Sequence, residues 1–420
     1  MSSHPSAAAT PPAAATAVSG GMTLLLAVAC GLIVANIYYA QPLIGPISVA
    51  LGLSPQAAGL IVTLTQVGYG VGLLLLVPLG DLIENRKLVL GVMGIGILAL
   101  LTAASASHAV PFLLAALCIG IGSVAVQILV PYAAHLAPEA MRGRVVGRVM
   151  SGLMLGIMLA RPVSSLITDL WSWHAVFLLS AGVMAILALV LRRALPRRQP
   201  VHSLSYGELL ASMGHLLANT PILRRRALYH AFLFGAFSLF WTTVPLLLAS
   251  PAYGLSQTGI ALFALAGVAG AIAAPIAGAV ADHGWSRPAT GLAMTAAALA
   301  FLMTQFAPPG STLALGLLVA AAIVLDFGVT ANLVLGQRAI YMLGAPLRSR
   351  LNGLFMAIFF VGGAIGSALG GWSYAHGGWS LTAWIGLCMP LAALLFYATE
   401  WSANKTQKQT QTPATIYEAE

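Results

Sequence analysis

The chain has 420 residues, of which 59% are hydrophobic and only 7% are charged. A soluble domain carries about 25% charged residues, so this chain cannot cover a water-facing surface of its own size. The composition therefore excludes an ordinary soluble protein and predicts an all-α membrane protein. The formal net charge of +9 does not indicate a nucleic-acid partner, because the positions of the basic residues follow the membrane topology.

Twelve apolar segments predict twelve transmembrane helices, since a helix needs about 20 apolar residues to cross a bilayer. A disordered tail, residues 1–20, is expected before them, and it lacks the basic region of a cleaved signal peptide. The first six spans are expected near 22–42, 57–79, 88–107, 110–133, 145–168 and 173–193. The last six are expected near 227–250, 257–280, 288–307, 311–336, 350–374 and 380–400.

These spans form two predicted six-helix bundles, residues 21–193 and 227–400. A basic linker, 194–226, joins the two bundles, and a polar tail, 401–420, ends the chain.

The basic residues gather in alternate connections between the spans. If the N-terminus is cytoplasmic, the cytoplasmic connections and the tail hold 18 of the 19 Lys and Arg residues, and Arg161 alone lies within a span. Membrane proteins keep their positively charged loops in the cytoplasm. The pattern therefore predicts a multi-pass protein of the bacterial inner membrane with both termini cytoplasmic.

The two halves of the sequence echo each other. Residues 131–144 and 337–350 align without a gap at an offset of 206, which superposes two arginines of each segment. At an offset of 201, the pair Asp81 and Arg86 falls on a second Asp–Arg pair in the other half. Such echoes at matching topological places predict a duplicated six-helix unit, a plan known among transporters.

Two loops carry the Asp–Arg echo: V-P-L-G-D-L-I-E-N-R-K, which begins at Val77, and G-A-V-A-D-H-G-W-S-R, which begins at Gly278. Together with the two bundles and the long basic linker, these loops resemble the major facilitator superfamily over roughly residues 20–400. The resemblance implies two pseudo-symmetric bundles that provide alternating access. It also implies that four residues of these loops form a gating latch: Asp81, Arg86, Asp282 and Arg287.

Two further stretches resemble the twelve-span drug, sugar and nucleoside efflux branch of that family. One is N-I-Y-Y-A-Q-P-L at 36–43, and the other is G-I-M-L-A-R-P-V-S-S, where Arg161 replaces the glycine of a Gly-Pro pair. The resemblance implies an exporter of small organic molecules that exchanges them for protons.

Two charged residues lie deep in the predicted spans, Arg161 in span five and Asp326 in span ten. A lone charge at the bilayer centre costs at least about 2.5–3.5 kcal/mol, so such residues face a cavity or a partner. We hypothesise that Asp326 carries the coupled proton or contacts substrate and that Arg161 tunes it. A nearby guanidinium favours the ionised acid, whereas burial favours the neutral one. The alternative is a static ion pair that only joins two helices.

Four polar side chains within spans are further candidates for substrate contacts. The resemblance implies that spans one, four, seven and ten line the central cavity, and the candidates on them are Asn36, Tyr39, Gln127 and Asn332. An inter-helix hydrogen bond is the alternative for each of them. Arg161 suggests an anionic or zwitterionic substrate, the neutral polar residues suggest a sugar or nucleoside, and the aromatic residues suggest a drug.

The sequence holds no nucleotide-binding motif of the GxxxxGK[ST] type, so ATP hydrolysis by this chain is not expected. The leading prediction is a monomeric, proton-coupled exporter without a cofactor or metal. An importer or facilitator of the same fold is the alternative. An intramembrane enzyme would need paired acids or histidines at catalytic or metal spacing, and a sensor would need a soluble output domain, so the sequence favours neither.

Overall fold

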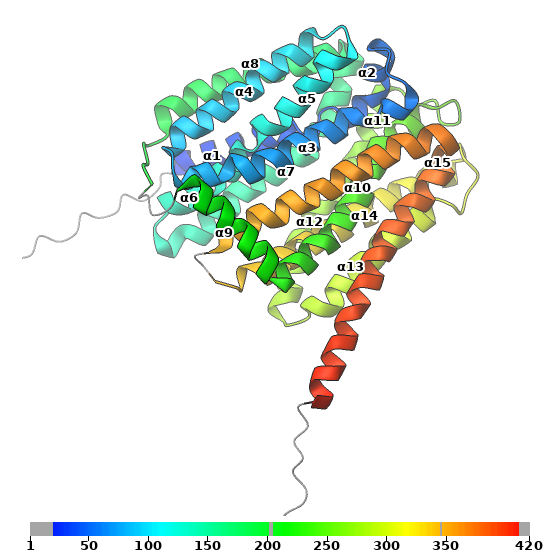
Figure 1. The fold of residues 1–420 in the computed structure, drawn as a ribbon. Helices are drawn as coiled ribbons and strands as arrows, with labels where there is room; N and C mark the ends of the chain where they lie inside the picture. Colours follow the sequence, from blue (N-terminus) through cyan, green and yellow to red (C-terminus); the bar gives the residue numbers. More distant parts are fainter. Residues whose placement is uncertain (1–19, 201–204, 345–346, 411–420) are drawn as a thin grey trace, which may run out of the picture.

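The computed structural model describes residues 20–200, 205–344 and 347–410, so the predicted N-terminal tail lies outside the described residues except for Gly20. All regular elements of the described residues are helices. Figure 1 shows two groups of long helices side by side, with the N-terminal half in blue to green and the C-terminal half in green to red.

The N-terminal group contains six passages. The first consists of α1 (Gly20–Ala35), η1 (Gln41–Leu43) and α2 (Ile44–Ala50), and the second of η2 (Pro55–Ala57), α3 (Leu60–Leu75) and η3 (Val77–Asp81). The third is α4 (Asn85–Ser105), and the fourth is α5 (Ala109–Ser123) with α6 (Ala125–Leu136). After η4 (Glu139–Met141), the fifth and sixth are α7 (Arg142–Leu170) and α8 (Trp173–Ala194).

The C-terminal group follows a linker helix, α9 (Tyr206–Asn219). Its passages are α10 (Pro221–Ala249), then α11 (Gln257–Ala264) with η5 (Leu265–Val268) and α12 (Ala269–Asp282), then α13 (Ser286–Met303) and α14 (Thr312–Tyr341). The last element, α15 (Arg348–Thr410), holds two passages. Its backbone leaves the helix at Gly377 and Gly378, and the φ of 57° at Gly378 is one that glycine adopts without a steric penalty.

The predicted twelve-span fold is confirmed. Nine helical stretches of the described residues are long and apolar enough to cross a membrane, and the last of them contains two spans. The shorter α1 and the less apolar α13 complete the twelve.

Most span boundaries lie within a few residues of the prediction, but the end predicted for span one near Gln41 and Pro42 was wrong. The chain continues through η1 and α2 to Ala50, because proline fits the start of a helix, where its missing N–H is not needed.

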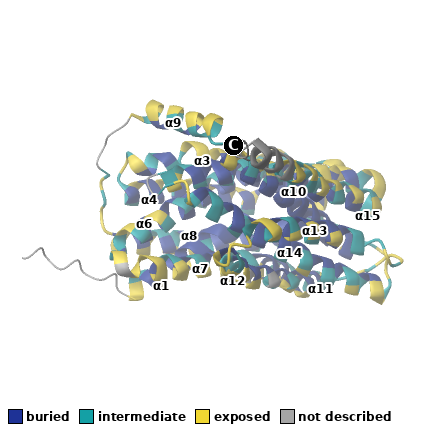
Figure 2. Ribbon diagram, turned by 90° about the horizontal axis from the view of Figure 1, so that it is seen from below, coloured by how far each residue is buried: buried dark blue, intermediate teal, exposed yellow. Residues whose placement is uncertain are grey.

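Large apolar side chains are exposed on the outer helices, as expected where lipid and not water surrounds a protein. Leu98 on α4 is 68% exposed, Ile186 on α8 is 64% exposed and Leu292 on α13 is 71% exposed. In contrast, α10 lies in the interior, and most of its side chains are buried (Figure 2).

Successive passages alternate in direction, so every second connection lies at the same end of the molecule. We call the end with the arginine-rich connections the basic face and the opposite end the neutral face. The linker helix α9 contacts both bundles at the basic face. The Tyr206 hydroxyl donates to the main-chain carbonyl at the end of α3 (2.9 Å), and Arg350 of α15 donates to the Ser212 hydroxyl (3.3 Å).

Capping bonds stabilise the start of α9. Ser205 donates through both its backbone N–H and its hydroxyl to the Glu208 carboxylate, at 2.7 and 2.8 Å, and these bonds hold the pKa of Glu208 below its ordinary value.

The two bundles join closely toward the neutral face. The hydroxyls of Thr63 and Ser367 are 2.8 Å apart, and the Thr258 hydroxyl donates to Asp169 at 2.6 Å. Helix α7 packs along α11, the half of span eight at the neutral face, and only lightly against α12, the half at the basic face. The described structure is therefore closed between the bundles at the neutral face.

Candidate functional site

Span one is interrupted where its polar residues gather. Helix α1 ends at Ala35, and residues 36–40 form turns before η1 begins. The amide of Asn36 donates to the carbonyls of Leu32 and Ile33 at 3.2 and 3.1 Å, which supplements the backbone bonds at the end of the broken helix. Irregular backbone within a membrane is tolerated where protein surrounds it, and such breaks are frequent at transporter binding sites.

Span eight is interrupted at a similar depth by the 3₁₀ turn η5. Gly267 in this turn lies directly against two charged side chains. A Cβ added there would be 2.9 Å from Asp326 Oδ2 and 3.4 Å from Arg161 Nη1. A larger residue there would therefore push the Asp326 carboxylate aside. Nothing in the sequence distinguishes Gly267 from the rest of the 44 glycines.

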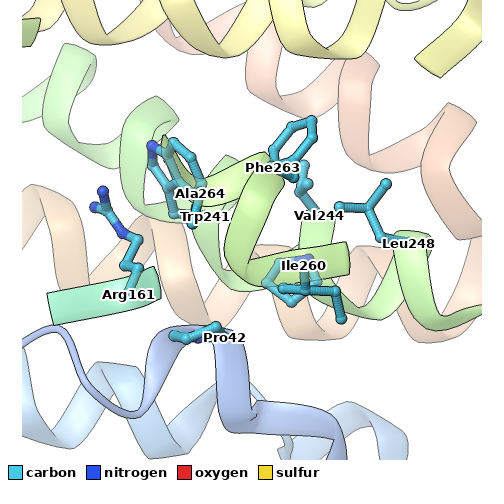
Figure 3. A pocket seen from close by; sticks show the side chains of 9 residues that line it. Pro42, Arg161, Trp241, Val244, Leu248, Ile260, Phe263 and Ala264 are labelled. Atoms are coloured by element: carbon cyan, nitrogen blue, oxygen red, sulfur yellow. The ribbon is translucent and has the colours of Figure 1, made fainter. Parts of the chain in front are cut away.

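The interruptions flank a buried group of four side chains, Arg161, Gln41, Trp241 and Asp326, which we call the central cluster. Arg161 is 2% exposed, and its Nε donates to Gln41 Oε1 at 2.7 Å. Its guanidinium lies 4.2 Å from the centre of the Trp241 ring. Figure 3 shows Arg161 extending from α7 toward Trp241 on α10, with Pro42 of η1 beside them.

The acid of the cluster is held by the same tryptophan. Asp326 is 4% exposed, and its Oδ1 accepts a hydrogen bond of 2.8 Å from the Trp241 indole N–H. The ion pairs found among the described residues, with N to O distances up to 4.0 Å, do not include Arg161 with Asp326. The indole thus joins the two charges, with the cation against its ring and the acid at its N–H.

The central cluster crosses the interface between the bundles. Arg161 and Gln41 belong to the N-terminal bundle, whereas Trp241 and Asp326 belong to the C-terminal bundle. Of these four residues, only Arg161 and Asp326 are predicted from the sequence to act in coupling. A signal for Trp241 existed, because a buried indole N–H needs an acceptor.

A second set of cross-bundle contacts involves polar residues of spans two and four, of which Gln127 was a predicted substrate contact. Gln127 donates to the Tyr69 hydroxyl at 3.0 Å, and the Tyr69 ring lies 4.4 Å from the ring of Phe360 in the other bundle. Gln66 donates to the Ser238 hydroxyl of α10 at 2.7 Å. The structure therefore places Gln127 beside the bundle interface through Tyr69.

The other three predicted substrate contacts lie outside the central cluster. Asn332 is 3.3 Å from the ring Nδ1 of His230, within the C-terminal bundle. Asn36 accepts a 2.6 Å bond from Ser180 within the N-terminal bundle. Tyr39 lines a groove along α1 and α7 whose other side chains include the exposed Leu24 and Leu155. The structure does not bring these three residues into the central cluster.

The first predicted latch loop is partnered within its own bundle. Arg86 forms an ion pair of 3.7 Å with Glu84 and donates to the main-chain oxygens of Arg192 and Leu195 at 3.1 and 3.4 Å. Asp81 ends η3 and is exposed.

In the second loop, Asp282 forms an ion pair with Arg338 of α14, and the Arg287 carbonyl accepts a bond of 2.8 Å from Tyr397. The latch residues thus lie at the basic face, and Glu84 and Arg338 are partners that the loop pattern did not indicate.

Comparisons with known proteins agree with this architecture. A sequence model of the Major Facilitator Superfamily matches residues 24–317 and 271–416. A protein of Escherichia coli O157:H7 named "Uncharacterized transporter YgaY" is 40% identical over 380 residues, which cover 90% of this chain and 95% of that protein. A protein of Streptomyces coelicolor named "Probable transporter SCO4007" is 33% identical over 384 residues, which cover 90% and 86%.

Solved structures share the fold. The nucleoside transporter NupG has a TM-score of 0.73 at 15% identity, over 90% of this chain and 99% of that one. A bacterial homologue of the human lysosomal transporter Spinster, inward-facing and occupied, has a TM-score of 0.71 at 16% identity, over 90% and 96%. This chain belongs to the major facilitator superfamily. It is a multi-pass membrane transporter and not an enzyme.

Proposed function

We propose that this transporter is a proton-coupled exporter of small organic molecules in the bacterial inner membrane, acting as a monomer by alternating access. The basic face and both termini are then cytoplasmic, because positively charged loops remain on that side. The neutral face, where Thr63 meets Ser367 and Thr258 meets Asp169, is closed toward the outside. The substrate region then opens to the cytoplasm, the side from which an exporter binds its substrate.

The central cluster is the observation that carries this proposal, because it places a buried acid and a buried cation across the interface that must open. While Asp326 is ionised and held by the Trp241 N–H, its attraction to Arg161 of the other bundle favours bundles that are closed at the neutral face. When Asp326 takes a proton, that attraction is lost and the bundles separate there at lower cost. Protonation of one side chain thereby biases the equilibrium between two arrangements.

The latch residues belong to the same proposal. In the arrangement described, Arg86 contacts Glu84 and Asp282 contacts Arg338, each within one bundle. We assign these contacts to the released latch. When the cytoplasmic face closes, Asp81, Arg86, Asp282 and Arg287 exchange them for partners across the interface.

The candidate substrate contacts Asn36, Tyr39, Gln127 and Asn332 remain part of the proposal with unequal support. Gln127 has the most, because its partner Tyr69 contacts the other bundle. For Asn36, the bonds to Leu32, Ile33 and Ser180 support a structural role.

Import of a metabolite is the second candidate function, and the neighbourhood of Asp326 makes it a specific one. A cationic substrate would compete with the proton for Asp326, so substrate and proton would be exchanged in opposite directions (antiport). An anionic substrate attracted to Arg161 would bind better once Asp326 is neutral, which gives movement in the same direction as the proton. The charge of the substrate therefore decides the direction of coupling.

The test is substrate-dependent proton flux in proteoliposomes that contain the full-length chain or its Asp326→Asn variant. Candidate substrates come from a growth screen of deletion and overexpression strains against toxic compounds. Wild-type protein should move protons when substrate is added, and the variant should transport without proton movement or not at all. Undiminished coupling in the variant would remove Asp326 from the mechanism. Substrate uptake into inverted vesicles, compared with uptake into right-side-out vesicles, distinguishes export from import.

A further inference from the structure

Two donors in the central cluster lack an acceptor. Arg161 Nη2 and Gln41 Nε2 are buried and make no hydrogen bond with any of the described residues. The two side chains are 2% and 1% exposed. A buried donor without an acceptor is unfavourable, and a charged one is more so. The bond of 2.7 Å between Arg161 Nε and Gln41 Oε1 keeps the two free N–H groups in one neighbourhood.

The surroundings of these donors define the charge of a ligand. The charged and titratable groups that face Asp326 are Arg161 on α7 and Tyr38 in the turn after α1. The other elements packed against it contribute Trp241 from α10 and Gly267 from η5. Once Asp326 is neutral, the cluster therefore carries one uncompensated positive charge, which matches a monoanion.

The guanidinium of Arg161 and the aromatic rings around it indicate the chemical groups of the ligand. A guanidinium presents parallel N–H groups that match the two oxygens of a carboxylate. Three aromatic rings surround the guanidinium, those of Trp241, Phe237 and Tyr38, at 4.2, 5.0 and 5.3 Å from its carbon. Such rings favour a flat apolar body next to the charged group.

We infer that the substrate is a small monocarboxylate with a flat apolar body, that Arg161 and Gln41 bind its carboxylate, and that it binds together with a proton on Asp326. This inference rests on the proton-carrying role of Asp326 proposed above and favours the second candidate function, import, because a proton and an anion that bind together move in the same direction. Of the three substrate classes that the sequence allowed, it selects the anion, because a neutral sugar would leave the buried cation without a counter-charge.

In the arrangement described, the carboxylate passes between the cluster and the basic face. On the other side of Arg161, toward the neutral face, the cavity lined by Pro42, Val244 and Phe263 has a volume of about 10 Å³, which holds no more than about one water. Toward the basic face, α7 packs only lightly against α12. Separation of these two helices opens a path without disturbing the closed neutral face.

Binding measurements on the full-length chain in nanodiscs test this inference. Benzoate and indole-3-acetate are compared with their uncharged amides, at pH values where both acids stay ionised. Each carboxylate should bind at least about tenfold more tightly than its amide, as expected for charge-assisted hydrogen bonds. Binding should tighten as the pH falls, and Asp326→Asn should bind tightly at every pH. Equal binding of acids and amides, or unchanged binding by Arg161→Gln, would overturn the inference.

A built-in carboxylate provides a test that does not depend on the choice of ligand. Gln41→Glu places an acceptor next to the free Arg161 donor, so its apparent melting temperature should rise and its binding of benzoate should disappear. Gln66→Glu is the matched control, because Gln66 is equally buried between the bundles but contacts Ser238. Its melting temperature should fall, since its new charge lacks a cation.

If Gln41→Glu is no more stable than Gln66→Glu and no carboxylate binds, water satisfies the two donors and the inference fails. Proton flux driven by a neutral compound would then still support the proposed function, so the two failures can be told apart.

Discussion

Two Asp–Arg neighbourhoods of this chain have the same chemistry in different surroundings. Asp326 and Arg161 are 4% and 2% exposed, whereas the side chains of Asp282 and Arg338 are 67% and 41% exposed at the basic face. The exposed residues form a direct ion pair, while Trp241 joins the buried ones. Because water screens exposed charges, a short distance between them does not imply a large contribution to the free energy of unfolding. The buried cluster, which has no direct ion pair, should dominate both stability and transport.

Removal of the buried cation should have the largest effect. Arg161→Gln leaves ionised Asp326 without its counter-charge, which should cost about 3–5 kcal/mol. The loss should shrink as the pH falls, because a protonated Asp326 no longer needs the cation. Thermal unfolding of the purified protein across pH measures this dependence.

Adding Asp326→Asn to Arg161→Gln is the control for this prediction. The double variant should regain most of the lost stability, and its stability should no longer depend on pH in this way. Losses that simply add would show that the two residues act independently.

Loss of the indole N–H should have the next largest effect. Trp241→Phe keeps a ring beneath Arg161 but removes the donor to Asp326, at a cost of about 1.5–3 kcal/mol for a hydrogen bond to a charged group. The pH dependence of transport should change as well, since the N–H stabilises the ionised acid. Trp372→Phe, at a residue that is 47% exposed, should leave stability and the pH profile as they are. Equal effects of the two variants would contradict the role of Trp241.

A methyl group at Gly267 should have a somewhat smaller effect. Gly267→Ala places a Cβ 2.9 Å from Asp326 Oδ2 and 3.3 Å from Trp241, so the carboxylate must move, at a cost of about 1–3 kcal/mol for overpacking. Proton-coupled transport should fall while the protein still folds. Gly316→Ala, on the helix that carries Asp326, is the control, because no neighbouring side chain or helix lies within 4 Å of the added Cβ. Normal transport by Gly267→Ala would show that the cluster tolerates rearrangement.

The exposed pair should matter least for stability. Arg338→Gln removes the ion pair with Asp282 and should change stability by about 0–1 kcal/mol, the range of surface salt bridges. Any change should diminish with added salt. A loss as large as that of Arg161→Gln would reverse the comparison between the two neighbourhoods.

Much of the architecture could be predicted from the sequence, because apolar length and arginine placement are local properties. Twelve spans followed from hydrophobic segments, and the family followed from the loops at Val77 and Gly278. The depth of Arg161 and Asp326 in their spans was equally readable. The continuation of span one beyond Pro42 was not, because a polar residue followed by proline also marks the end of a helix.

The sequence alone determined that lipid surrounds two related helical bundles and that one acid and one cation lie deep within them, because charge frequency and spacing decide both. Only the tertiary structure decided that Trp241 joins these charges, that Gln41 and Gly267 complete their surroundings, and that Asn36 and Asn332 bond within their own bundles. Those outcomes depend on which helix faces meet across an interface, and residues far apart in the chain decide that together.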